Sequence, residues 1–245
     1  MRIPDVRFKA ISIGKVGGFG VDADDDIHEL QTGKLVQIPG KLVHVSAGDS
    51  VWGVNKDNDI FTCSGEGNYT WRHVPGKLTN VDVSDKGSVW GINREHHIFK
   101  MEGGTWKRIE GPERAVQVSV GESGVWLVQE NGDIYYKTGS YGDKDCPGTD
   151  WTKVDGNLKW IASGPGIVCG VNTKYETFYR AGVTYENHTG TDWRRVNNNK
   201  GDKLDPIEIV NYDYSQVDLH ESVMFGRNSN LEVSMVIRRP RNEDG

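Results

Sequence analysis

The sequence predicts an all-β fold built from many short antiparallel strands, and three observations support this prediction. The chain of 245 residues contains 31 glycines and eight tryptophans, a composition that favours short strands joined by tight turns over helices. No stretch has the apolar spacing of an amphipathic helix. A segment of about twelve residues also recurs along the chain, which indicates a repeat architecture.

The clearest copies of this segment are "SVWGVNKDNDIF" at residues 50–61 and "SVWGINREHHIF" at residues 88–99. Four more copies read "GGFGVDADDDIH" (17–28), "GVWLVQENGDIY" (124–135), "IVCGVNTKYETF" (167–178) and "VMFGRNSNLEV" (223–233). In every copy a polar residue precedes an apolar or β-branched residue by five positions: Asp22 and Ile27, Asn55 and Ile60, Asn93 and Ile98, Gln129 and Ile134, Asn172 and Thr177, Asn228 and Val233. The pattern predicts two strands joined by a tight turn.

Two further elements complete each repeat. A Trp-containing segment follows most copies: "TWRHVPGKL" (70–78), "TWKRIEGPE" (105–113), "DWTKVDGNL" (150–158) and "DWRRVNNN" (192–199), with "KLVQIPGKL" (34–42) lacking the Trp. A short alternating run then leads into the next copy: "LVHVSAG" (42–48), "RAVQVSVG" (114–121) and "KWIASGPG" (159–166). Each repeat therefore supplies four short antiparallel strands.

The repeat period points to a β-propeller, because 33 residues separate Gly20 from Gly53 and 38 separate Gly53 from Gly91. The last copy is followed by a third strand and no Trp segment, whereas "RIPD" at residues 2–5 resembles the fourth-strand sequences "QIPG" and "HVPG". We therefore expect a six-bladed β-propeller of four-stranded antiparallel blades, with the ring closed by the N-terminal strand completing the last blade. The predicted single domain spans residues 1–245, in units 8–42, 43–78, 79–113, 114–158, 159–199 and 200–240 plus 1–6.

Charge and composition limit the partners of the chain. Its formal net charge of -6 argues against nucleic acid, and the one basic cluster, Arg238, Arg239 and Arg241, is diluted by acidic neighbours. No apolar stretch approaches the roughly 20 residues that span a bilayer, so we expect no membrane insertion. No apolar signal region follows Met1, which fits a mature secreted form, the interpretation we favour, or a cytoplasmic protein.

The three cysteines and two glycosylation sequons bear on this choice of compartment. Buried or free thiols are the simpler interpretation of Cys63, Cys146 and Cys169, and a disulfide between Cys146 and Cys169 is the alternative. Asn68-Tyr-Thr and Asn187-His-Thr match the acceptor sequence for N-linked glycans, which matters in a secreted protein.

The order V-W-G-V-N-x-x-x-x-I-[FY], then W-x-x-[VI]-x-G-x-L, then a V-x-V-x-x-G run, is similar to the tectonin repeat. The resemblance covers nearly the whole chain and extends to the fish-egg lectins, the tachylectin of the same repeat type, and the slime-mould and mushroom tectonins. It implies a six-bladed propeller that binds carbohydrate, typically N-acetylglucosamine-type or O-methylated sugars on microbial surfaces, without catalysis. The chain departs from the pattern at Leu127, where Gly is usual, and at Cys169 and Phe225, where Trp is usual.

The repeated polar residues have two interpretations, which are compatible with each other. A short polar side chain at a tight turn hydrogen-bonds nearby backbone, and the same side chain, held at one end of a ring, can bind sugar hydroxyls or an acetamido group. The candidates are Asp22, Asn55, Asn93, Gln129, Asn172 and Asn228, with Asp57 and Arg94 in the variable turn positions. Equivalent sites are expected to differ in strength through the variable residues "KDND", "REHH" and "ENGD".

The tryptophans fall into two sets with different expected roles. Trp52, Trp90 and Trp126 are flanked by Val in the middle of a strand, so core packing is expected. The second set starts the fourth strand, where an indole can be half exposed and stack on a sugar ring: Trp71, Trp106, Trp151 and Trp193. Two longer loops, residues 137–150 and 180–192, are predicted to lie on the same face of adjacent blades and are either binding loops or tolerated insertions.

Enzyme and metal sites are not supported by the repeat. The acidic run at residues 22–26 lacks the Gly and the final Glu that a calcium loop requires, and no catalytic constellation or cofactor motif is evident. The prediction is a lectin without cofactors that binds glycans on microbial or cell surfaces through several weak sites, with a role in innate defence or agglutination. The alternative is a scaffold for protein–protein interaction, and association into a homo-oligomer is left open.

Overall fold

The computed structural model describes residues 8–31, 34–65, 67, 69–142 and 150–196, and three further strands at Tyr214–His220, Val223–Asn228 and Val233–Ile237. All elements assigned in these ranges are β-strands. None of the described residues forms a helix that is long and apolar enough to cross a membrane.

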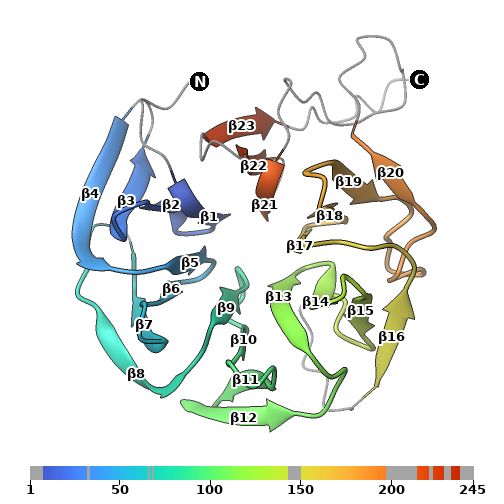
Figure 1. The fold of residues 1–245 in the computed structure, drawn as a ribbon, viewed down its shortest axis with the longest axis horizontal. Helices are drawn as coiled ribbons and strands as arrows, with labels where there is room; N and C mark the ends of the chain where they lie inside the picture. The colour runs from blue at the N-terminus through green and yellow to red at the C-terminus, as the bar shows by residue number, and fades with distance from the viewer. Residues whose placement is uncertain are drawn as a thin grey trace.

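Twenty of the strands form five four-stranded antiparallel blades in chain order. Blade one contains β1 (Phe8–Gly14), β2 (Gly17–Asp22), β3 (Asp26–Gln31) and β4 (Lys34–Lys41); blade two contains β5 (His44–Ala47), β6 (Val51–Val54), β7 (Asp59–Cys63) and β8 (Arg72–Lys77); blade three contains β9 (Asn80–Val83), β10 (Val89–Ile92), β11 (Ile98–Glu102) and β12 (Thr105–Ile109). Blade four contains β13 (Ala115–Gly121), β14 (Gly124–Gln129), β15 (Ile134–Lys137) and β16 (Trp151–Val154); blade five contains β17 (Trp160–Gly164), β18 (Ile167–Val171), β19 (Thr177–Arg180) and β20 (Trp193–Arg195). The blades surround a central axis, with the first strand of each nearest the centre and the fourth at the rim (Figure 1).

The prediction of a β-propeller is confirmed, but the prediction of six four-stranded blades is wrong. The remaining strands, β21 (Tyr214–His220), β22 (Val223–Asn228) and β23 (Val233–Ile237), form a sheet of three strands. The described chain contains no fourth strand after β23, and the strand predicted at residues 2–5 lies outside the described residues. The three-stranded sheet lies between blades five and one, where β21 contacts both β17 and β1 (Figure 1).

The apolar core is divided among the junctions between blades. Val51 of β6 packs in a cluster with Phe19, Val21 and Ile27 of blade one, whereas Trp52, its neighbour in the strand, packs with residues of blades two and three. Successive residues of a strand point to opposite faces, so both faces of a blade are buried and the second strands read as continuous apolar runs. Trp52, Trp90 and Trp126 are 6%, 1% and 0% exposed, which confirms their predicted role in the core.

The repeated Gly of blades two and three is required by a close contact with the leucine that precedes the first strand of the same blade. A Cβ at Gly53 would lie 2.4 Å from Leu42 Cδ1, and a Cβ at Gly91 would lie 2.4 Å from Leu78 Cδ1. A larger residue at either position would overlap the leucine unless the leucine moved.

Blade four reverses this large and small pair, which explains one departure from the repeat. Leu127 occupies the position of the Gly, and Ala115 occupies the region where blades two, three and five place a Leu. Both residues are fully buried in the cluster between blades three and four. The large side chain comes from the second strand instead of from the residue that precedes the first, as expected for a core that tolerates compensating substitutions.

Side chains on the first strands connect the blades around the axis. Ser12 Oγ accepts a hydrogen bond from the Ala47 N–H (2.8 Å), Ser46 Oγ from the Val83 N–H (3.0 Å), and Ser119 Oγ from the Ser163 N–H (3.0 Å). Asp82 replaces the serine in blade three, and its Oδ2 accepts from the Val120 N–H at 2.7 Å. An equivalent hydrogen bond, accepted at the same position of the repeat, therefore recurs at four consecutive junctions between blades.

Asp82 is the one ionisable residue in this series. Its Oδ1 also accepts a hydrogen bond from Ser46 Oγ (2.6 Å), so the carboxyl group joins blades two, three and four. Burial raises the pKa of Asp82 to about 6. The hydrogen bonds from Ser46 and Val120 lower the pKa and offset part of this rise.

We expect Gly91→Ala to destabilise the protein by about 1–3 kcal/mol, because the new methyl group overlaps Leu78. Leu78→Ala removes the overlapping group, so Gly91→Ala should cost less in that background. Urea unfolding of the two single variants and the double variant measures this coupling. Strictly additive free energies of unfolding would contradict the packing explanation.

We also expect Asp82 to make stability depend on pH. The folded protein binds the Asp82 proton more tightly than the unfolded chain does, so its contribution to stability is present at about pH 4 and is lost as the pH rises to about 6, by up to about 3 kcal/mol. Asp82→Ser, which restores the residue of the other blades, should flatten the profile of melting temperature between pH 4 and pH 7. Asp57→Ser, at an exposed turn, is the control and should keep the wild-type profile.

Candidate functional site

The turn between the second and third strands has the same backbone geometry in all five blades. Three residues after the repeated polar residue, the chain enters the left-handed region at Asp25, Asn58, His96, Gly132 and Tyr175, with φ between 64° and 87°. The N–H of this residue donates to the carbonyl of the repeated polar residue over 2.9–3.3 Å. Asn, Asp and Gly tolerate this conformation best, which explains their frequency in the variable turn positions.

The repeated polar side chains support these turns from within. Asn55 Oδ1 accepts hydrogen bonds from the N–H groups of Asp57 (3.0 Å) and Asp59 (2.8 Å), and Asn172 Oδ1 accepts from Lys174 (2.9 Å) and Glu176 (3.0 Å). Asp22 accepts in the same way from Asp24 and Asp26, both at 2.9 Å. The acceptor oxygen of the repeated side chain is therefore used by its own turn.

Asn93 differs from Asn55 and Asn172 in its amide nitrogen. The Nδ2 of Asn55 donates to Asp59 Oδ2 (3.4 Å), and that of Asn172 donates to Glu176 Oε2 (2.7 Å). The equivalent position in blade three is His97, whose N–H donates to Asn93 Oδ1 (2.9 Å). Among the described residues, Asn93 Nδ2 has no hydrogen-bond partner, so this donor can serve a ligand.

Gln129 and Asn228 do not follow this arrangement. Gln129 is one methylene longer, and its Nε2 donates to the Glu113 carbonyl of blade three, while Asn131 Oδ1 accepts from the Asp133 N–H (3.0 Å) within the turn. Asn228 ends β22, and only its backbone is described.

The fourth-strand tryptophans pack against the preceding blade. The indole N–H of Trp71 donates to the Pro39 carbonyl (2.6 Å), that of Trp151 to the Glu110 carbonyl (3.1 Å), and that of Trp193 to the Asp155 carbonyl (2.8 Å). In addition, Trp151 meets Trp90 edge to face, with ring centroids 6.4 Å apart. These indoles are half-buried, and they join neighbouring blades at the rim.

Trp106 is the exception in this set. Its ring packs edge to face with Trp52, with centroids 6.0 Å apart, and lies over Gly76 as the other indoles lie over their glycines. Its N–H is buried, however, and has no hydrogen-bond partner among the described residues. A buried donor without a partner lowers the free energy of unfolding by about 1–3 kcal/mol. Within the described chain, the hydrogen bond of the rim indole is therefore missing at this junction and present at its neighbours.

A pocket of about 590 Å³ opens at this junction, between blades two and three. Its apolar surface comes from Leu78, Phe99 and Trp106, and Leu78 is the buried residue that packs over Gly91. Its polar residues come from the two turns and from the end of β8: Lys56, Asp57, Asn58, Lys77, Asn93, Arg94 and Glu95. The pocket thus combines aromatic and aliphatic surface with amide, cationic and carboxylate groups.

Ion pairing organises one side of this pocket. Lys77 Nζ lies 2.6 Å from Asp59 Oδ1 and 3.0 Å from the Asp57 carbonyl, so it connects β8 to the turn of blade two. The hydrogen bond from Lys77 lowers the pKa of Asp59. On the opposite side, Arg94 and Glu95 are exposed, and neither makes a hydrogen bond or ion pair with another described residue.

Of the twelve residues predicted to bind ligand, four meet in this pocket: Asp57, Asn93, Arg94 and Trp106. Seven others do not line it, although two of them, Asn55 and Trp71, belong to blade two: Asp22, Asn55, Gln129, Asn172, Trp71, Trp151 and Trp193. The side chain of Asn228 is not described. The sequence interpretation missed Lys56, Asn58, Lys77, Glu95 and Phe99 as lining residues. Three of these lining residues, Lys56, Asn58 and Glu95, lie in the variable turn segments "KDND" and "REHH" of the repeat. No feature of the sequence distinguishes Lys77 or Phe99 as lining residues.

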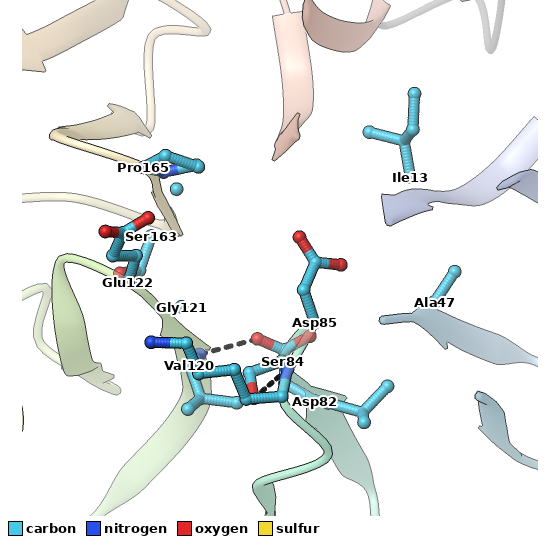
Figure 2. Close-up of a pocket in the computed structure, with 13 residues that line it drawn as sticks. Ile13, Ala47, Asp82, Ser84, Asp85, Val120, Gly121, Glu122, Ser163 and Pro165 are labelled. Atoms are coloured by element: carbon cyan, nitrogen blue, oxygen red, sulfur yellow. Dashed lines mark hydrogen bonds between the residues drawn. The ribbon is translucent and has the colours of Figure 1, made fainter. Parts of the chain in front are cut away.

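A second, smaller pocket of about 70 Å³ lies near the axis, on the face opposite to these turns. Figure 2 shows Asp82, Ser84 and Asp85 from the end of β9, Glu122 from the turn after β13, and Ser163 and Pro165 from the region of β17. No group of three or more His, Cys, Asp or Glu in the described chain is placed to hold a metal ion. Cys63 and Cys169 are buried, as the simpler interpretation of the cysteines expects. The alternative, a disulfide between Cys146 and Cys169, stays untested because Cys146 lies outside the described residues.

Comparison with known proteins relates the chain to curated and solved relatives. A segment of 82 residues is 35% identical to the Perivitellin-2 31 kDa subunit of Pomacea maculata, and the match covers 33% of this chain and 28% of that protein. The fold is similar to human WBSCR16, with a TM-score of 0.59 and 11% identity over 94% of this chain and 77% of that one. It is also similar to YCF48 bound to D1 peptide, with a TM-score of 0.56 and 14% identity over 98% of this chain and 80% of that one.

These structural likenesses concern the fold alone, because the identities are low. The tectonin domain model, in contrast, matches residues 1–111 and 104–219, which together are most of the chain and include the turns and tryptophans described above. The chain therefore belongs to the tectonin family.

Proposed function

We propose that this protein is a carbohydrate-binding lectin and that the pocket between blades two and three is its main binding site. The observation that supports this proposal is the meeting of Asp57, Asn93, Arg94 and Trp106, four residues selected independently from the sequence, around one pocket with an aromatic surface. Sugars are amphipathic, with an apolar ring face and a polar edge, so they need both kinds of surface in one site.

Each group in the pocket has a role in this proposal. Trp106 and Phe99 offer ring surface to the apolar face of a sugar, and Asn93 Nδ2 and the Arg94 guanidinium donate to hydroxyl or acetamido oxygens. The carboxylates of Asp57 and Glu95 accept from sugar hydroxyls. N-acetylglucosamine-type or O-methylated sugars are the ligand class we propose, and binding requires no cofactor and no catalytic residue.

Several weak sites on one rigid ring suit a multivalent role. Equivalent turns lie on the same face of the ring, and in each the backbone carbonyl of the repeated polar residue accepts a hydrogen bond: Asp22, Asn55, Gln129 and Asn172. The variable residues beside them differ from blade to blade. Linked weak sites raise the avidity for a glycan-coated surface by about 10²-fold or more when they engage together. We propose an extracellular role in agglutination or innate defence on this basis.

A glycan array at physiological salt tests the proposal, followed by isothermal titration with the best monosaccharide. Binding to N-acetylglucosamine-type or O-methylated glycans is the expected result. Absence of glycan binding, together with recovery of a specific protein partner in a pulldown, would replace the lectin by an interaction scaffold.

Arg94→Ala should weaken binding of the monosaccharide by about tenfold, because a charge-assisted hydrogen bond contributes about 1.5–3 kcal/mol. Its effect on the melting temperature should be small, because Arg94 is exposed and makes no hydrogen bond or ion pair with another described residue. Arg72→Ala, an exposed arginine on β8 outside the pocket, is the matched control and should bind as the wild type does. Equal affinities of the three proteins would exclude this pocket as the main site.

Trp106→Phe and Trp151→Phe form a matched pair for the pocket aromatic. Both substitutions reduce an indole to a phenyl ring, but only Trp151→Phe also removes a satisfied hydrogen bond, the one to the Glu110 carbonyl. Trp151→Phe should therefore destabilise the protein by about 1 kcal/mol more than Trp106→Phe in urea unfolding. The reverse order would show that the Trp106 N–H has a partner in solution.

A further inference from the structure

The loop between β19 and β20 contains a sequon that the proposed lectin site does not use. This loop, residues 181–192, includes Asn187-His188-Thr189, and it joins the third and fourth strands of blade five. The β-turns that line the pocket join second and third strands instead. Because strands alternate in direction within a blade, the two kinds of connection lie on opposite faces of the ring.

Backbone hydrogen bonds hold Asn187 in a compact turn and leave its side chain available. Thr184 Oγ1 accepts from the N–H groups of Glu186 (3.2 Å) and Asn187 (3.1 Å), and the Asn187 carbonyl accepts from the N–H groups of Thr184 (3.0 Å) and Gly190 (3.2 Å). Within the described part of the chain, neither the Asn187 amide nor the Thr189 hydroxyl makes a side-chain hydrogen bond. A bulky group on Asn187 Nδ2 would therefore break no described hydrogen bond.

An exposed aromatic ring stands two residues before Asn187. Tyr185 is 64% exposed, the highest value for a large hydrophobic side chain in the described chain. Its ring meets those of Tyr141 and His188 edge to face, with centroids 6.2 and 6.1 Å away, while Tyr141 and His188 stack at 4.9 Å with an interplanar angle of 9°. These contacts orient Tyr185 while its outer surface stays open to solvent.

The second sequon of the chain, Asn68-Tyr69-Thr70, lacks this arrangement. Asn68 lies outside the described residues, and the residue two positions before it is Glu66. Tyr69, in its middle position, packs edge to face against the buried Phe19, with ring centroids 6.2 Å apart. An exposed aromatic ring two positions before the acceptor is thus specific to Asn187.

We infer that Asn187 carries an N-linked glycan and that its first N-acetylglucosamine stacks on Tyr185. The amide nitrogen of Asn187 attacks the anomeric carbon of a lipid-linked diphospho-oligosaccharide, the donor used in the secretory pathway. A C–N bond forms, the bond from the anomeric carbon to the phosphate oxygen breaks, and the lipid diphosphate leaves as the amide loses one proton. The attached sugar then covers the Tyr185 ring, as a sugar's apolar face does on an aromatic surface.

Secretion of the full-length chain from insect cells behind a signal peptide tests the attachment. Glycopeptide mass spectrometry should find Asn187 occupied, Asn187→Gln and Thr189→Ala should abolish occupancy there, and Thr189→Ser should retain it. A secreted, folded protein with unmodified Asn187 would overturn the inference. The outcome is separate from that of the lectin proposal, because sugar binding is measured on unglycosylated protein from bacteria.

The stacking on Tyr185 is tested on the same protein after trimming. Endoglycosidase H leaves one N-acetylglucosamine on Asn187, and the unglycosylated protein from bacteria, which has the same sequence, is the reference without sugar. The single sugar should raise the melting temperature by about 2–4 °C in the wild type and in Tyr185→Phe, and should lose this effect in Tyr185→Ala. An equal shift in all three proteins would overturn the stacking, even with Asn187 occupied.

Discussion

The hydrogen bond from one first strand to the next around the axis is the interaction on which the rest of the structure depends. Ser12, Ser46, Asp82 and Ser119 each accept the N–H of the following blade, so the innermost strands are held at a constant spacing. A blade of four strands buries neither face alone, and its apolar residues become a core only when the neighbouring blade is held against it. Asp82 introduces a pH dependence at one junction of an otherwise uncharged series.

The candidate site is a consequence of how two blades meet. Its polar residues come from two turns of the same geometry, and its apolar residues come from the junction that Leu78 and Trp106 form. The indole N–H groups of Trp71, Trp151 and Trp193 are paired with carbonyls of the preceding blades. The amides of Asn55 and Asn172 are paired with acidic neighbours. In the junction between blades two and three, neither the Trp106 N–H nor the Asn93 amide has a partner among the described residues, and this difference is the basis of the proposed site.

The two faces of the ring have different chemistry for the same topological reason. One face presents short turns of nearly constant length, where equivalent sites can repeat. The other face presents connections of variable length, and the loop after β19 uses this freedom to expose Tyr185 beside Asn187. A glycan there would leave the pocket on the opposite face accessible.

The strands, their order, the turn positions and the burial of Trp52, Trp90 and Trp126 were predictable from the sequence, because these depend on local periodicity and on residues a few positions apart. The sequence did not determine the number of four-stranded blades, since the pairing of chain ends is not a local property. Which candidates lie around one pocket could not be predicted from the sequence, because Asp57 and Trp106 are brought together by packing between blades. Packing also separates two asparagines that look alike in the sequence. The Asn55 amide donates to the Asp59 carboxylate, whereas the Asn93 amide has no partner among the described residues because His97 stands in the position of Asp59.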